Sequence, residues 1–160
     1  MSSTATRLTF DNLEDHVERQ IALTPWMRVS QDDVTAFGHL TGDPDPMHID
    51  PDWAQAESPY GATVLAGLHL LSLLPRLSRG SGLEIAGVRL AMNYGFNRVR
   101  FVAPVSVGAE LRNRIQILSV DRRPDGKAAL VTRNVLEVRD VEGPAVIAEW
   151  VNLLWPETRA

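Results

Sequence analysis

The segment from Gly61 to Leu77, GATVLAGLHLLSLLPRL, constrains the fold of this chain more than any other. Between Val64 and Leu74 its apolar residues occupy almost every face of a helix, so that helix would expose a hydrophobic surface on all sides. Such a helix is stable in water only when other elements enclose it. Nowhere in the chain do eighteen apolar residues run together, so the segment is predicted to lie in a protein core and not to span a membrane.

The enclosing elements are predicted downstream of residue 83, where the sequence changes from helical to strand-like patterns. Residues 122–127, RRPDGK, place proline and glycine where a chain can reverse, so the two flanking runs are predicted to form a hairpin. We expect an α+β fold in which a curved antiparallel sheet wraps one long apolar helix, with edge strands that pair across a dimer. The strand-like runs are LEIAGVRLAMNYGF, RVRFVAPV, AELRNRIQILSVDRR, KAALVTRNVLEVRD and PAVIAEWVNLLW.

The N-terminal third is predicted to be mainly helical. Residues 10–22 would form a helix with Leu13, Val17 and Ile21 on one face, and PWMRVS, residues 25–30, has the pattern of a short strand. The next helix begins at a capping box and ends before a glycine, and a third begins with a proline behind an aspartate cap. Ser30 and Asp33 form the capping box of the second helix, Gly42 ends it, and its inward face carries Val34, Phe37 and Leu40. Asp50 caps the third helix, which begins at Pro51.

Composition indicates one globular domain, which we take as residues 1–160. A chain of 160 residues with 44% hydrophobic residues can build a sizeable core but is short for two domains. A net charge of −4 gives no general attraction to nucleic acid or to an anionic membrane. The absence of cysteine excludes disulfides and thiolate sites, and the N-terminus has no secretory pattern, so we expect the cytoplasm.

The stretch GDPDPMHID, residues 42–50, gathers four ionisable side chains within nine residues. Pro44 and Pro46 fix backbone torsions and lack amide donors, so we expect a stiff loop without regular helix or strand. The four groups could form a metal site, an acid/base pair or turn contacts. A calcium loop needs a mid-loop glycine and a terminal glutamate, which are absent, so no metal is expected. The acids Asp45, Asp50 and Asp52 are interpreted as caps and solvated groups.

A longer motif surrounds this loop: an aromatic residue, then Gly-Asp, then proline and an aliphatic residue before histidine, and a small residue six places later. Together with NYGFNRVRFVAPV at residues 93–105 and the tail AEWVNLLW, it covers most of residues 25–155. This pattern resembles the MaoC-like hydratases of the hot dog fold, the R-specific enoyl-CoA hydratases, and within them the nodulation-protein-N-like branch. The matching positions are Phe37, Thr41, Gly42, Asp43, Pro46, Met47, His48 and Ala54.

The resemblance implies reversible hydration of a 2-enoyl-CoA to an (R)-3-hydroxyacyl-CoA, with the CoA thioester as substrate and no other cofactor. It implies that Asp43 and His48 activate one water, and that the backbone N–H of Gly67 faces the thioester oxygen. The chain departs from the family pattern at Asp45, where Asn is frequent, and at Ala66, where His is usual, and either change could alter substrate preference or weaken activity. Further substrate contacts are predicted at Tyr60, Gly61, Ala66, Asn93 and Arg100.

Two other functions remain open from the sequence. A hot dog acyl-CoA thioesterase would use a carboxylate on or near the central helix, but residues 61–77 contain none. A non-catalytic module that binds acyl thioesters would fit the two departures from the motif. For any of the three we expect a homodimer or dimer of dimers, with the CoA phosphates near one of several arginines: Arg76, Arg98, Arg100, Arg112 or Arg114. The remaining histidines, His16, His39 and His69, are interpreted as surface or packing residues, and Leu68, Leu71 and Leu74 as core.

Overall fold

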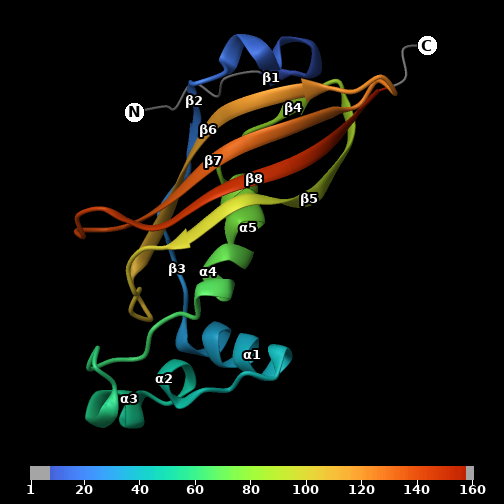
Figure 1. Ribbon diagram of the computed structural model, residues 1–160. Coiled ribbons are helices and arrows are strands. Elements are labelled where there is room, and N and C mark those ends of the chain that lie inside the picture. Colours follow the sequence, from blue (N-terminus) through green and yellow to red (C-terminus); the bar gives the residue numbers. More distant parts are fainter. Residues whose placement is uncertain (1–7, 158–160) are drawn as a thin grey trace.

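The computed structural model describes residues 8–157, and its largest element is a six-stranded antiparallel sheet (Figure 1). The strands follow the order β2, β6, β7, β8 and β5, and β3 pairs with β6 beyond the end of β2. The hairpin predicted at residues 122–127 is confirmed, since it joins β6 to β7 with Arg122 opposite Ala128. The strands are β2 (Gln20–Leu23), β3 (Met27–Arg28), β5 (Val88–Phe101), β6 (Glu110–Arg122), β7 (Ala128–Val138) and β8 (Pro144–Pro156).

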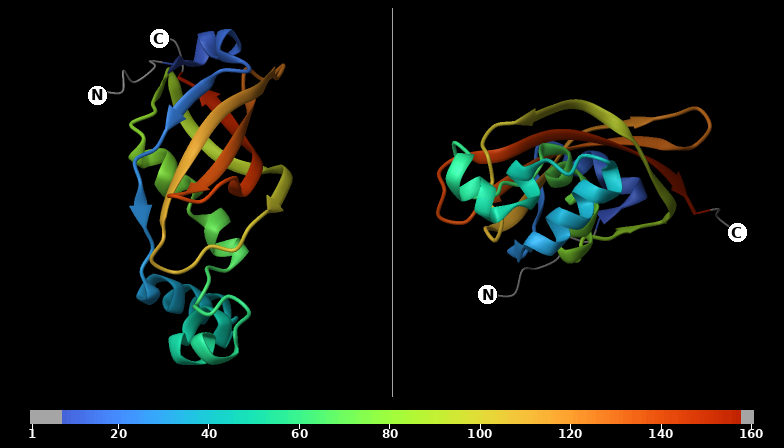
Figure 2. Two further views of the ribbon diagram at one scale, coloured as in Figure 1. Left: turned by 90° about the vertical axis from the view of Figure 1, so that its left-hand side faces the viewer. Right: turned by 90° about the horizontal axis from the view of Figure 1, so that it is seen from below.

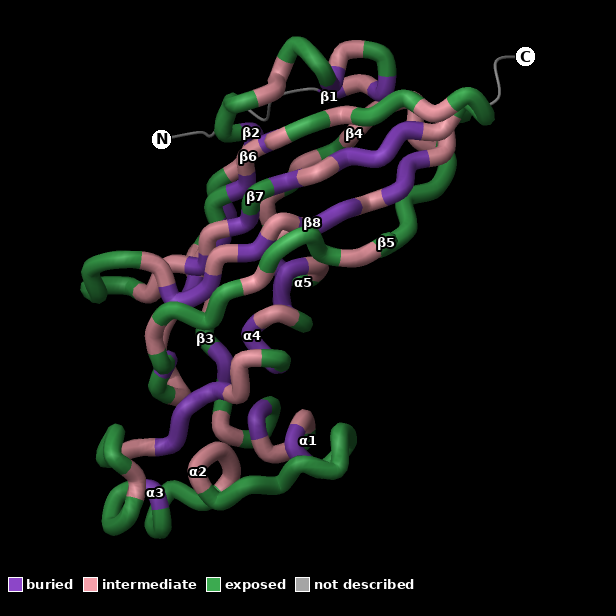
Figure 3. The backbone as a smooth tube through the Cα atoms, viewed as in Figure 1, coloured by how far each residue is buried: buried purple, intermediate pink, exposed green. Residues whose placement is uncertain are grey.

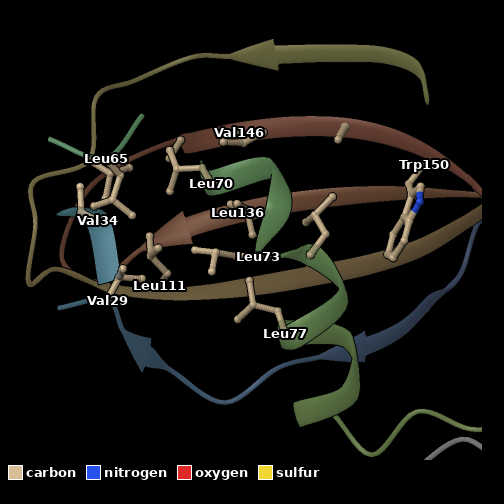
Figure 4. Close-up of a cluster of buried hydrophobic side chains, with 14 residues drawn as sticks. Val29, Val34, Leu65, Leu70, Leu73, Leu77, Leu111, Leu136, Val146 and Trp150 are labelled. Carbon is tan, nitrogen blue, oxygen red and sulfur yellow. The ribbon is translucent and has the colours of Figure 1, made fainter. Parts of the chain in front are cut away.

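Two short helices, α4 (Gly67–Ser72) and α5 (Leu74–Gly80), pack on the concave face of this sheet (Figure 2). Figure 4 shows Leu70, Leu73 and Leu77 on the side of these helices that faces the strands, where Leu111 and Leu136 complete the cluster. Burial of such leucines contributes about 1.5–3 kcal/mol each. The predicted arrangement, a curved antiparallel sheet around an apolar helical segment, is therefore confirmed.

The central helix begins later than predicted. Residues 61–66 are not helical: Gly61 has a φ of 64°, and the amide of Leu65 donates to the carbonyl oxygen of Val105 at 2.8 Å in a strand-like contact. The helix can start only after this contact ends, at Gly67.

The central helix is also interrupted. Leu73 separates α4 from α5, and Pro75 in the next turn has no amide hydrogen and crowds the carbonyl one turn earlier, which ends a regular helix. One long helix was therefore a wrong prediction. Leu68 on α4 was predicted as core, but its side chain is 67% exposed in the single chain.

The prediction of one helix across residues 10–22 is wrong. A 3-10 helix, η1 (Phe10–His16), is followed by strand β2, and Glu18 between them has a φ of 61° that reverses the chain. Leu13 and Ile21 are both buried, but they enter the same cluster from these two different elements. Beside them, β1 (Leu8–Thr9) and β4 (Ile85–Ala86) form a short parallel pair.

Three helices between residues 31 and 57 form a largely exposed lobe at one end of the sheet (Figures 1 and 3). The predicted capping box is confirmed, since the Ser30 hydroxyl accepts a hydrogen bond from the Asp33 amide at 3.1 Å. Gly42 ends the first helix with a φ of 73°, as predicted. Leu40, predicted to face inward, is 86% exposed. The helices are α1 (Gln31–Thr41), α2 (Pro46–Ile49) and α3 (Pro51–Glu57).

Strand β5 forms one edge of the sheet and exposes large apolar side chains. Leu90, Met92, Tyr94 and Phe96 are each between 41% and 59% exposed. An edge strand of this length presents unpaired backbone groups to any chain that lies beside it. Within residues 8–157, no helix has the length and apolar character needed to cross a membrane.

Candidate active site

His48 lies on α2, a single helical turn within the loop for which no regular helix was predicted. Pro46 starts this turn, because a proline at the first helical position loses no hydrogen bond, and the Asp45 side chain caps it by accepting from the Met47 amide at 2.8 Å. The proline that was expected to exclude a helix instead begins one. The interpretation of Asp45 as a cap is confirmed, and so is that of Asp50, which accepts from the Trp53 amide at 3.0 Å.

The imidazole of His48 is held by the main chain. Its Nδ1 lies 2.7 Å from the carbonyl oxygen of Val64, and since a carbonyl can only accept, Nδ1 carries the hydrogen and donates it. The neutral ring then has its free electron pair on Nε2. A histidine fixed in this way can accept or return a proton at Nε2 alone.

Gln31 binds both segments that this hydrogen bond joins, the one with His48 and the one with Val64. Its Nε2 donates to the carbonyl of His48 at 2.8 Å, and its Oε1 accepts from the hydroxyl of Thr63 at 2.7 Å. One side chain therefore joins α1 to α2 and to the extended segment that supplies Val64. The sequence contained no signal for this role, because the partners lie 17 and 32 residues away.

His48 borders an open cavity of about 460 Å³ between α2, the start of α4 and the end of β5. Most of its lining residues are apolar in type, which suits an acyl group. Two further predicted site residues, Tyr60 and Gly67, line the same cavity. The remaining lining residues are Met47, Val64, Leu65, Leu70, Phe101, Val102, Ala103 and Pro104.

Gly67 is the first residue of α4, so its amide has no acceptor within the helix. The ring of Phe101 lies against its Cα, and a Cβ at this position would be 2.9 Å from Phe101 Cγ. Only glycine fits here without movement of that ring. The phenylalanine that creates this requirement was not identified from the sequence, because its contact with residue 67 depends on how β5 crosses α4.

The other predicted site residues are not among the described residues that line this cavity. Asp43 is exposed, and its amide donates to the carbonyl of Gly38 at 2.9 Å, which fixes the loop to the end of α1. Arg100 is exposed on β5, where its guanidinium donates to the carbonyl of Val99. Asn93 lines a separate apolar cavity of about 230 Å³ next to α4. The last two such residues, Gly61 and Ala66, precede α4.

His69 lies on α4, two residues beyond Gly67, and is buried, with 5% of its surface exposed. Its ring stacks on Phe37 of α1 with centroids 4.4 Å apart and an interplanar angle of 3°. Burial lowers the pKa of His69, the charge of Asp33 opposes this shift, and the charge of His48 adds to it. The interpretation of His69 as a packing residue is confirmed, although the sequence did not indicate its partner.

A second cavity of about 460 Å³ lies on the face of β6 opposite the core, and none of the predicted site residues lines it. Arg112 and Arg114 both form ion pairs with Glu137 there, and Arg112 also lies 4.4 Å from the ring centroid of Trp26. These two arginines, named as candidates for CoA phosphates, are thus already paired. Across residues 8–157, no three acidic or histidine side chains gather as they would around a metal ion.

Comparison with known protein families identifies the family to which this chain belongs. The family model described as MaoC like domain matches residues 12–139, which is most of the chain. The chain belongs to the MaoC-like dehydratase family. The resemblance identified from the sequence is therefore confirmed.

Individual relatives agree with this assignment. This MaoC-like protein is 35% identical over 144 residues to 3-hydroxyacyl-thioester dehydratase Z of Mycobacterium tuberculosis, with 88% of this chain and 94% of the relative covered. It is 29% identical to nodulation protein N of Rhizobium leguminosarum, with 92% and 91% covered. The crystal structure of the MaoC-like dehydratase from Rhodospirillum rubrum superimposes with a TM-score of 0.78 at 20% identity, covering 95% and 99% of the two chains. The hot dog fold predicted from the sequence is thus confirmed.

Proposed function

We propose that this protein is a hydro-lyase that adds water reversibly to a 2-enoyl-CoA and forms an (R)-3-hydroxyacyl-CoA. One observation carries the proposal: His48 lines the same cavity as Gly67, and its Nδ1 is bonded to the Val64 carbonyl at 2.7 Å, so that Nε2 remains for proton transfer. Family membership and a relative named 3-hydroxyacyl-thioester dehydratase support the same reaction class.

In hydration, the oxygen of water bonds to Cβ of the enoyl group while the water proton is taken up by a base. The π electrons of the Cα–Cβ bond move toward the thioester oxygen, and a proton then reaches Cα. His48 is assigned the proton transfers, because a neutral imidazole with one occupied nitrogen can accept a proton and deliver it at the other. Dehydration is the same sequence reversed.

Asp43 is assigned as the second group that contacts the catalytic water. This assignment comes from the sequence motif, since the cavity is lined by the neighbouring Met47 and His48 and not by Asp43 itself. Its backbone is held by the hydrogen bond to Gly38, so that the carboxylate extends from a fixed point close to α2. A carboxylate that accepts one hydrogen of the water would orient it toward Cβ.

The backbone N–H of Gly67 is assigned to the thioester oxygen. The amide is unpaired within α4, and the absence of a Cβ lets the thioester approach closely. Negative charge develops on this oxygen only during the reaction, so a donor aimed at it stabilises the transition state more than the substrate. The loss of a side-chain imidazole at Ala66 leaves this backbone contact intact.

The substrate proposal is a CoA thioester with no additional cofactor or metal. Tyr60, 49% exposed at the cavity mouth, and Gly61 are assigned to the pantetheine arm, and Arg100, Ala66 and Asn93 remain candidate substrate contacts. We propose a homodimer or dimer of dimers, because β5 leaves an apolar edge uncovered. The cysteine-free composition supports a reducing compartment such as the cytoplasm.

The direct test is incubation of the purified protein with 2-enoyl-CoA thioesters of graded length, while the conjugated-enoyl absorbance and free thiol are followed together. We expect the absorbance to fall to an equilibrium value without release of thiol. Thiol release would indicate a thioesterase instead. Calorimetric binding of the thioesters without turnover at any length would indicate a binding module.

A further inference from the structure

His69 is a buried polar side chain that the proposed reaction does not use. Among residues 8–157, its Nδ1 is one of two buried side-chain atoms without a hydrogen-bond partner. Leaving a polar nitrogen unpaired in a protein interior is unfavourable, so an ordinary core position would be better filled by an apolar residue. The contact that the structure shows for His69 is the stacking of its flat ring on Phe37.

The ring of His69 joins α4, which begins at Gly67, to α1, which leads into the loop of Asp43. His69 belongs to the first turn of α4, and its ring stacks on Phe37 of α1. Nearly parallel rings with centroids 4.4 Å apart form an offset stack, an arrangement that aromatic pairs prefer. The stack therefore fixes the distance between the end of α1 and the start of α4.

The end of α1 is in turn attached to the loop that carries Asp43. Gly38, next to Phe37, accepts the hydrogen bond from the Asp43 amide at 2.9 Å. A Cβ on Gly38 would lie 3.1 Å from the Asp43 carbonyl oxygen and 3.2 Å from a methyl carbon of Ile49, so helix and loop are in direct contact. Movement of Phe37 would therefore move the loop.

Burial lowers the pKa of the His69 imidazole. Burial favours the uncharged ring, and of the charged groups that act on it, Asp33 on α1 opposes and His48 on α2 reinforces that preference. A neutral ring stacks on phenylalanine without the desolvation cost of a buried cation.

We propose that His69 is a positioning residue: its ring, stacked on Phe37, holds the loop of Asp43 at a fixed distance from the amide of Gly67. The inference rests on the proposed hydratase function for its effect on turnover, but the positioning itself can be observed without any substrate. It predicts that the flat shape at residue 69 matters and that the nitrogens do not.

The first measurement is hydrogen exchange of the peptide covering residues 38–50, in the wild type, His69→Leu and His69→Phe. Leucine removes the ring, so we expect exchange in this peptide to be roughly tenfold faster, whereas phenylalanine restores the stack and the slow exchange. The matched control is His39→Leu, which changes an exposed histidine of α1, the helix of Phe37, and is expected to leave the exchange of residues 42–50 unchanged. Equal exchange in the wild type and His69→Leu would overturn the proposal whether or not the protein is an enzyme.

The second measurement is the steady-state kinetics of the same variants with a 2-enoyl-CoA. We expect kcat of His69→Leu to fall about tenfold or more with KM changed less than about threefold, and His69→Phe to recover most of kcat, because misplacement of catalytic groups lowers turnover more than binding. An equal loss in His69→Phe and His69→Leu would overturn the proposal, since a nitrogen would then be required. Altered exchange in His69→Leu with no turnover in the wild type would keep the positioning role and refute the hydratase function.

Discussion

Single side chains set the shape of the cavity through their contacts with neighbouring main-chain atoms. Gly67 accommodates the ring of Phe101, and Gln31 holds the carbonyl of His48, so neither acts through a reactive group of its own. Both contacts lead to quantitative expectations.

Gly67→Ala would place a Cβ 2.9 Å from Phe101 Cγ, which forces the ring or α4 to move. We expect kcat for enoyl-CoA hydration to fall by about 10²-fold, because a shift of roughly 1 Å in a positioned group has an effect of this size. Gly80→Ala is the matched control, since nothing lies within 4 Å of its Cβ position. Partial recovery of kcat in Gly67→Ala combined with Phe101→Leu would attribute the loss to this contact, and wild-type turnover in Gly67→Ala would contradict it.

Gln31→Ala would leave the His48 carbonyl and the Thr63 hydroxyl without their partners. Such a loss costs about 1–3 kcal/mol of unfolding free energy when the groups are buried. We expect urea unfolding to show a decrease in this range, together with reduced kcat because α2 is less firmly held. Gln55→Ala on the exposed face of α3 serves as the comparison, and the account would be wrong if both variants were equally stable.

At the scale of single residues, the sequence could indicate chemistry but not contacts. The family resemblance named His48, Tyr60 and Gly67 as site residues, and the structure places all three around one cavity. Gln31 and Phe101 were missed because their partners are distant along the chain and a glutamine or phenylalanine has no distinctive spacing. Their identification required the fold.

Among the elements, α1 depends on its cap. Ser30 and Asp33 satisfy each other's backbone groups at its first turn, so Ser30→Ala is expected to cost about 1 kcal/mol at pH 7. The hydrogen bond from Ser30 lowers the pKa of Asp33. The carboxylate therefore stabilises the fold fully at pH values above the ordinary pKa of aspartate, and this stabilisation is lost as the pH falls through the lowered pKa. Urea unfolding of both proteins at pH 7 and about pH 3 should therefore show a smaller difference in acid. A difference that grows toward low pH would contradict this explanation.

Element boundaries were predictable where they depend on local chemistry. The capping box, the glycine end of α1 and the aspartate cap of α3 follow from residues a few positions apart. Residues 10–22 and 61–77 were misread because pairing with distant strands overrode their helical pattern: Ile21 enters β2 against β6, and Leu65 bonds to Val105. Apolar periodicity alone does not distinguish a helix from a segment that a sheet captures.

For the whole molecule, a single chain leaves an apolar surface beside β5 exposed to water. Leu68, 67% exposed, and Phe96, 41% exposed, line one apolar cavity beside this edge. Leu68 was predicted as core from sequence, which is consistent with burial by a second copy of the chain.

We expect light scattering to give about twice the chain mass of 17.7 kDa, or four times for a dimer of dimers. Leu68→Lys would place a charge in the covered surface and shift the protein toward monomer, since an unpaired buried charge is costly. Val141→Lys, in an exposed turn away from β5, should leave the mass unchanged. A wild-type monomer at micromolar concentration would contradict the proposed assembly.

The central claim is that His48 transfers protons to and from a water that Asp43 orients, beside the amide of Gly67. Its most direct test compares kcat for hydration of a short 2-enoyl-CoA by the wild type, His48→Gln and Asp43→Asn, with circular dichroism to verify that each variant is folded. We predict a loss of about 10²–10⁴-fold in both folded variants, the size of a general acid/base contribution. Wild-type turnover in folded His48→Gln would contradict the account.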